Sequence, residues 1–125
     1  MKIVILGDPR TKKNSLRAFN GRVLPSKAYS DYARTALPQL TRMQADMIRT
    51  PVNVRCVYFM QTRRKVDLVN LLEGTLDLLV GSGILEDDNS RIVAGMDGSR
   101  VAYDKANPRV EIEIGDADNA EPREP

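Results

Sequence analysis

The sequence predicts an α+β fold, a single domain in which two main helices pack on a small mixed β-sheet. Apolar residues recur with helical spacing in residues 26–47 and 67–81, and they alternate or form short runs in residues 2–6, 51–62 and 108–114. A length of 125 residues with 42% hydrophobic content allows one core but hardly two independent domains. The order strand, helix, strand, helix, two strands places the helices on one side of the sheet.

The first strand is predicted at residues 2–6, an apolar run that ends at Gly7-Asp8-Pro9. Residues 9–25 then form a basic loop with little periodicity, and Asn20-Gly21 favours a small hairpin within it. Such a loop is either a binding element or only a solubilising surface. Its cations are Arg10, Lys12, Lys13, Arg17 and Arg22.

A first helix is predicted to start after Ser26, which has the side chain of an N-cap. Pro38 is expected to kink this helix or split it in two. The tyrosines at helical spacing could stack on DNA bases, but such spacing is more typical of core residues. The predicted inward side comprises Tyr29, Tyr32, Ala33, Ala36, Leu40, Met43 and Met47.

The next strand, residues 51–62, is predicted to bury one face made of Val52, Val54, Cys56, Tyr58 and Met60. Cys56 is interpreted as a packed apolar side chain, because the chain has no histidine to activate a thiol. Residues 90–103 and 108–114 are expected to pair with each other as closing antiparallel strands. In the second of these, Val110, Ile112 and Ile114 point inward. Domain 1–115 is followed by a tail, 116–125, that is predicted to be disordered.

The segment from Arg63 to Asn89 carries most of the functional argument. Its helix has an apolar side, Leu68, Leu71, Leu72, Thr75, Leu76, Leu78 and Leu79, opposite a polar stripe, Asp67, Asn70, Glu73 and Asp77. Gly74 falls in that stripe and indicates that something approaches the helix backbone closely on the polar side. Gly81 and Gly83 end the helix. The acidic turn Glu86-Asp87-Asp88 follows.

Composition restricts which metal ions and partners the chain can bind. Without histidine the usual zinc sites cannot be built, so a metal would have to be bound by oxygen ligands, which Mg²⁺, Mn²⁺ and Ca²⁺ prefer.

Residues 1–65 carry 14 Lys and Arg against 3 Asp and Glu, while residues 66–125 carry 5 against 14, so the net charges of the two segments are +11 and −9. A basic surface for a polyanion and an acidic patch are therefore expected. No signal peptide or membrane-spanning segment is found, which favours the cytoplasm.

Hydrolysis of a phosphodiester needs at least two or three carboxylates that bind a magnesium ion and one nearby cationic side chain. Asp67 and the pair Asp87-Asp88 can meet if a strand starting near Ser90 runs beside the strand that ends near Thr62. The alternative is that Asp67 is only an N-cap, the stripe is a hydrated helix face and the acidic turn is an ordinary polar turn.

The order Asp67, Asn70, Asp77, Gly83 and Asp87-Asp88 resembles the signature D-x-D-N-L-x-K, aspartate, glycine, D-D of the RusA family of Holliday-junction resolvases. The resemblance implies a homodimeric, Mg²⁺-dependent endonuclease, often phage-encoded, that cuts four-way DNA junctions symmetrically. It implies that Asp67 and Asp88 are catalytic metal ligands with Asp87 as a neighbouring ligand. Asn70 and Asp77 would support them. The expected DNA-binding residues are Lys12, Lys13, Arg17, Arg63, Arg64 and Lys65.

The chain departs from that signature at two positions. Val69 replaces its second aspartate, and Glu73 replaces its lysine. Glu73 is a candidate for the missing catalytic carboxylate, and Lys12, Lys13 or Arg17 for the missing cation. Three hypotheses follow: a junction endonuclease using Mg²⁺ or Mn²⁺, a junction-binding module with weak or no cleavage, and a small protein-interaction domain.

Overall fold

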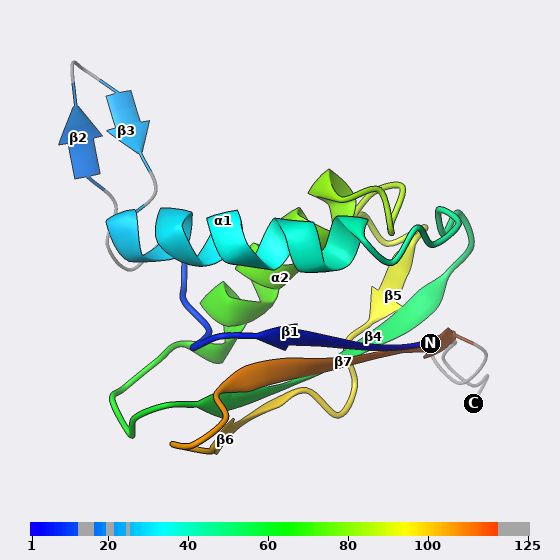
Figure 1. The fold of residues 1–125 in the computed structure, drawn as a ribbon. Helices are drawn as coiled ribbons and strands as arrows, with labels where there is room; N and C mark the ends of the chain where they lie inside the picture. The colour runs from blue at the N-terminus through cyan, green and yellow to red at the C-terminus, as the bar shows by residue number, and fades with distance from the viewer. Residues whose placement is uncertain (13–16, 20–21, 25, 118–125) are drawn as a thin grey trace, which may run out of the picture.

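The computed structural model describes residues 1–12, 17–19, 22–24 and 26–117, with backbone only for residues 17–19 and 22–24. Of the predicted tail, residues 118–125 lie outside this part of the chain. A hairpin does form in the basic loop, where β2 (Arg17–Phe19) pairs antiparallel with β3 (Arg22–Leu24). The Asn20-Gly21 dipeptide lies outside the described residues. The hairpin projects from the body near the start of α1 (Figure 1).

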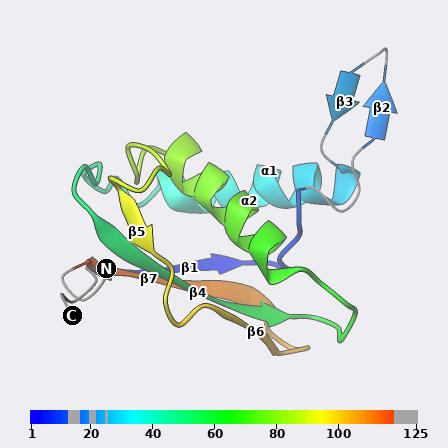
Figure 2. The same ribbon diagram turned by 180° about the vertical axis from the view of Figure 1, so that it is seen from behind.

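The α+β fold is confirmed as one mixed sheet of five strands with two helices on one face (Figures 1 and 2). The long strands are β1 (Lys2–Leu6), β4 (Val52–Met60) and β7 (Arg109–Asp116), and β7 lies between β1 and β4, antiparallel to both. The short strands β5 (Val93–Gly95) and β6 (Arg100–Tyr103) run parallel to β4 along its other edge. No helix among the described residues combines the length and apolar content needed to cross a bilayer.

The predicted antiparallel pairing of residues 90–103 with 108–114 is wrong. β7 takes its hydrogen bonds from β1 and β4, and both short strands pair with β4 instead. The predicted inward side of β7 is nevertheless correct, since Val110, Ile112 and Ile114 are all buried. Alternation specifies which face of a strand is buried, but it does not specify the neighbouring strand.

The first helix, α1 (Lys27–Thr41), starts as predicted, because the Tyr29 N–H donates to Ser26 Oγ (3.1 Å). Tyr29, Tyr32, Ala36 and Leu40 are buried and Ala33 is partly buried. The predicted split at Pro38 does not occur, since the helix continues through Pro38 and ends one turn later. Met43 and Met47 therefore lie beyond the helix and are 37% and 40% exposed, against the prediction that both face inward.

The core lies between the sheet and the helices. All five predicted inward residues of β4 are buried, and Tyr58 Oη shares a hydrogen bond with Thr75 Oγ1 of α2 (2.7 Å). Cys56 is fully buried, and this burial raises the pKa of its thiol to about 11, well above the ordinary 9.0. The interpretation of Cys56 as a packed apolar side chain is therefore confirmed.

The second helix, α2 (Leu68–Gly81), contacts α1 at Gly74. The Tyr29 hydroxyl donates to the Gly74 carbonyl (3.1 Å), and a Cβ on Gly74 would lie 3.0 Å from Tyr29 Cε1. A close approach was correctly predicted, but its direction was wrong. Gly74 is buried against α1 and does not belong to the polar stripe.

Candidate functional site

Asp67 is the N-cap of α2. Its Oδ1 accepts hydrogen bonds from the N–H groups of Val69 (2.9 Å) and Asn70 (3.3 Å). Its Oδ2 accepts no hydrogen bond from any described residue. Asp67 therefore has the capping role of the simpler alternative, and it retains one oxygen that is able to bind a cation or a donor.

The polar stripe continues along α2 through Asn70, Glu73 and Asp77. Lys12 from the basic loop forms an ion pair with Asp77, with 2.8 Å between Nζ and Oδ2. The loop therefore reaches this face of α2 and brings a cation to it, as the hypothesis for replacing the motif lysine requires. Asn70 and Glu73 have interaction partners as well. The predicted contributions of Lys13 and the Arg17 side chain lie outside the described residues.

The acidic turn lies beyond the C-terminal end of α2. The Asp88 N–H donates to Asp87 Oδ1 (2.7 Å). Partial desolvation, the hydrogen bond with Asp87 and the negative charges of Asp87 and Asp77 raise the pKa of the Asp88 carboxyl. The turn is held in place because the Glu86 N–H donates to the Ile48 carbonyl (3.0 Å), just before β4. Asp77 and Asp87 are thus the acids that contribute to the raised pKa of Asp88.

The strand pairing that was predicted to bring Asp67 and Asp88 together within one copy of the chain does not form, and their convergence on one metal ion stays a prediction. Ten residues along α2 correspond to roughly 15 Å, and this separates Asp67 from Asp77, the stripe residue near the acidic turn. The strand after the turn pairs with the start of β4, where Val93 lies opposite Val52, and not with its end near Thr62. Within the described ranges, no group of three or more acidic or cysteine side chains is placed to hold a metal.

A divalent cation fits these residues in part. Asp87 and Asp88 supply oxygen ligands of the kind that Mg²⁺ prefers. Desolvation is the largest cause of the raised pKa of Asp88, and a cation would relieve the smaller contribution from the charges of Asp87 and Asp77. An ion at this pair would take its remaining ligands from water, phosphate oxygens or other protein groups. The metal-binding roles of Asp67, Asp87 and Asp88 stay predictions.

A cluster of cations lies near the other end of α2, and Asp8 organises it. Asp8 Oδ2 accepts from Arg64 Nη1 (2.9 Å) and lies 3.3 Å from Arg10 Nη2, while Asp8 Oδ1 accepts from the Gln61 N–H (2.9 Å). Arg64 Nη2 also donates to the Pro9 carbonyl (3.0 Å). Sequence reasoning missed Asp8 and did not include Arg10 among the expected DNA-binding residues. The sequence feature that could have drawn attention to both residues is the Gly7-Asp8-Pro9 turn at the end of β1.

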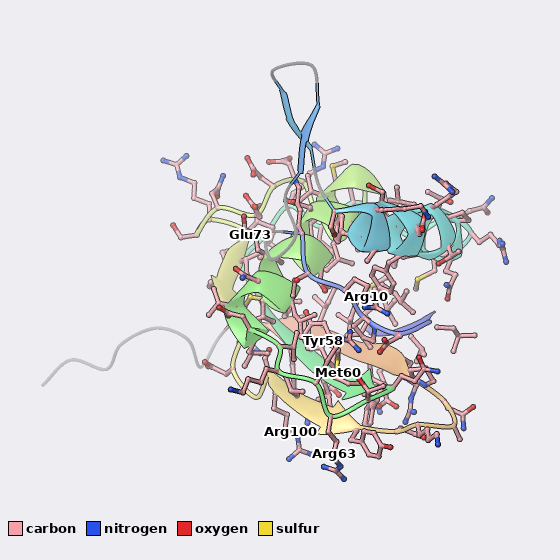
Figure 3. The ribbon with its side chains drawn as sticks, turned by 90° about the vertical axis from the view of Figure 1, so that its left-hand side faces the viewer. Arg10, Tyr58, Met60, Arg63, Glu73 and Arg100 are labelled. Atoms are coloured by element: carbon pink, nitrogen blue, oxygen red, sulfur yellow. The ribbon has the colours of Figure 1, made fainter. Side chains whose placement is uncertain are left out.

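The predicted DNA-binding cations before α2 point in different directions. The Arg63 guanidinium stacks 4.3 Å from the centre of the Tyr103 ring at the end of the sheet. Figure 3 shows Arg63 and Arg100 projecting on the opposite side of the molecule from the β2–β3 hairpin. Arg64 instead turns toward Asp8. The guanidinium groups of Arg63 and Arg64 therefore have different partners, although both residues line a pocket at the end of β4.

The family model described as Endodeoxyribonuclease RusA matches residues 6–115, which is most of the chain. The matched segment contains both ends of α2 and the basic loop. No curated protein matches the sequence.

Proposed function

Because the chain belongs to the RusA family of Holliday-junction-resolving endodeoxyribonucleases, we propose that it cuts four-way DNA junctions by paired symmetric nicks, in a reaction that depends on Mg²⁺ or Mn²⁺. The proposal includes a homodimer, with one cut per subunit, acting in recombination and repair in the cytoplasm of a bacterial or phage-infected cell. The observation that carries it is the arrangement of α2 within the matched segment, with paired acids beyond one end and organised cations near the other.

The cations have the role of binding the DNA backbone. Lys12, Arg64 and Lys65 approach α2 from the loop after β1 and from the segment before the helix, while Arg63 lies at the end of the sheet. Lys13 and Arg17 are included in the proposal. Each phosphate contact releases counterions, so binding should weaken steeply with salt, with a slope of about −0.9 per phosphate.

The acids have the role of holding the cation. Asp87 and Asp88 are the proposed pair of ligands, and Asp67 offers its Oδ2, which accepts no hydrogen bond within the described part of the chain. A bound Mg²⁺ supplies an activated water and neutralises charge on the phosphoryl group. Asn70 and Asp77 support the acidic face, and Glu73 is proposed to replace the carboxylate that Val69 lacks. The remaining oxygen ligands would come from water, from DNA or from the second copy.

A junction-binding module with weak or no cleavage is the alternative. Two positions favour it. Val69 is 68% exposed and offers no metal ligand where the family signature has an aspartate. Glu73 places a negative charge where the signature has a lysine, which disfavours the approach of a phosphate unless a cation lies between them.

The test uses a synthetic four-way junction labelled on each strand, incubated with and without Mg²⁺. We expect symmetric nicks in opposing strands only with the metal. Asp67→Asn and Asp88→Asn should lower cleavage at least ~100-fold, as expected for loss of charge stabilisation at a reaction centre, and leave binding intact. Asp116→Asn, which removes the same charge from the end of β7, is the matched control.

Three outcomes are informative. Tight binding without products under all metal conditions supports the alternative. Cleavage that survives both substitutions contradicts the assignment of the acids. Sedimentation of the free protein as a monomer, with junctions bound by a single copy, contradicts the homodimer.

A further inference from the structure

A pocket of about 250 Å³ opens between the loop after β1, the first turn of α1 and the segment that leads into α2. Among the described residues that line it, three are cations, Arg10, Arg64 and Lys65, and none is an acid. None of them is aromatic either, so the pocket offers no ring on which a base could stack. Its lining is suited to a small anion.

Two of the three cations are held in position from behind. Asp8 does not line the pocket, and its side chain is only 11% exposed, yet it contacts Arg64 at 2.9 Å and Arg10 at 3.3 Å. The Pro9 carbonyl fixes the second Arg64 nitrogen at 3.0 Å. One carboxylate cannot neutralise three cations, so the group keeps a net charge of about +2 at neutral pH.

The opposite wall is also suited to an anion. Ser26 and Ala28 line it, and they belong to the start of α1, a helix of 15 residues whose N-terminal end carries partial positive charge. Ser26 Oγ already accepts from the Tyr29 N–H, while no described group accepts from the Ala28 N–H. The cationic side chains therefore face a wall with donors and no competing acid.

We propose that this pocket binds one phosphate group of the DNA backbone. Its volume of about 250 Å³ is below the roughly 300–1,000 Å³ of pockets that enclose drug-sized ligands, so a phosphodiester fits better than a whole nucleotide. Val66 lines the pocket and Asp67 follows it directly, so the bound phosphate holds the DNA strand beside the start of α2. The DNA origin of the phosphate rests on the proposed function.

The test compares Arg10→Gln with Arg34→Gln in the full chain. Both variants lose one positive charge, but Arg34 is an exposed residue on α1 that pairs with Asp31. Affinity for an uncut four-way junction is measured without divalent metal from 0.05 to 0.4 M salt. Arg10→Gln should lower the magnitude of the salt slope by about 0.9, equivalent to about eightfold weaker binding at 0.1 M salt. Arg34→Gln should leave the slope unchanged, and equal effects of the two variants would overturn the proposal.

A second measurement separates DNA phosphate from free phosphate. Inorganic phosphate is titrated while the Nε–H signals of Arg10 and Arg64 are followed by NMR, against chloride at equal ionic strength. Shifts specific to phosphate, together with the reduced DNA slope, support the proposal. Phosphate-specific shifts with an unchanged slope overturn the DNA assignment. Both measurements omit metal and cleavage, so a protein that binds but does not cut would contradict the proposed function and leave this inference standing.

Discussion

Replacing Gly74 with alanine sets two measurable effects against each other at the contact between α1 and α2. Alanine stabilises a helix interior by about 1 kcal/mol relative to glycine. The new Cβ, however, would lie 3.0 Å from Cε1 of the Tyr29 ring, which is buried and bound to the Gly74 carbonyl through its hydroxyl. Overpacking of this kind costs about 1–3 kcal/mol. We expect Gly74→Ala to lower the free energy of unfolding by about 1 kcal/mol, the difference between the two effects.

Urea denaturation gives this change directly, and the melting temperature should fall by roughly 4 °C for a domain of this size. Gly81→Ala is the matched control in the same helix, because its Cβ would meet Leu37 Cδ2 at an ordinary 4.0 Å. That variant should be as stable as the wild type or more stable.

A double-mutant cycle with Tyr29→Leu identifies the cause. Without the tyrosine ring, Gly74→Ala should become stabilising by about 1 kcal/mol, which gives a coupling energy of roughly 2 kcal/mol. A Gly74→Ala protein that is about 1 kcal/mol more stable than the wild type, with Tyr29 present, would refute the idea that glycine is needed for this contact.

Three further predictions concern single side chains. Asp8→Asn removes the charge that holds Arg10 and Arg64, so we expect the free energy of unfolding to fall by about 1–3 kcal/mol. DNA binding should weaken although the net positive charge of the protein rises. Tighter DNA binding would show that Asp8 does not position these arginines. Lys12→Gln breaks a pair with both side chains more than one third exposed, so urea denaturation should show a change below about 1 kcal/mol. The pKa of Cys56 is raised from 9.0 to about 11 by burial, so its contribution to stability is fully present below pH 9 and is lost as pH rises toward about 11. Native alkylation at pH 8 should accordingly be far slower than in urea, and Cys56→Ala should have a smaller stability loss above pH 9.

Much of the fold could be predicted because its signals are local. The period of two in β4 and β7 predicted their buried faces, and Ser26 and Asp67 were correctly expected at the starts of helices. The neighbours of β7 could not be predicted in the same way. Any of several strands can satisfy its backbone groups, and the choice depends on how distant parts of the chain are packed.

The candidate site shows the same limit. The Asp8–Arg64 pair joins residues 56 positions apart, and the Tyr29–Gly74 hydrogen bond joins residues 45 apart. Neither pairing leaves a periodic signal in the sequence. Gly74 did indicate a close contact, because glycine within a helix is unfavourable without a reason. The direction of that contact depended on the position of α1, which periodicity alone does not give.

The basic and acidic halves of the sequence do not form two separate surfaces, because some of their side chains form ion pairs with each other. The charges that remain unpaired are separated along α2. Lys12–Asp77 and Arg49–Glu86 join the basic and acidic halves of the chain, so each of these cations has an acidic partner. The pocket beside the start of α2 keeps unneutralised cations, whereas in the turn beyond its end desolvation and the neighbouring acids together raise the pKa of Asp88. Under the proposed function, DNA should therefore bind at the Asp67 end without metal, and a phosphate should approach Asp87 and Asp88 only with a divalent cation between them. Binding that requires Mg²⁺ even for the pocket phosphate would contradict this order.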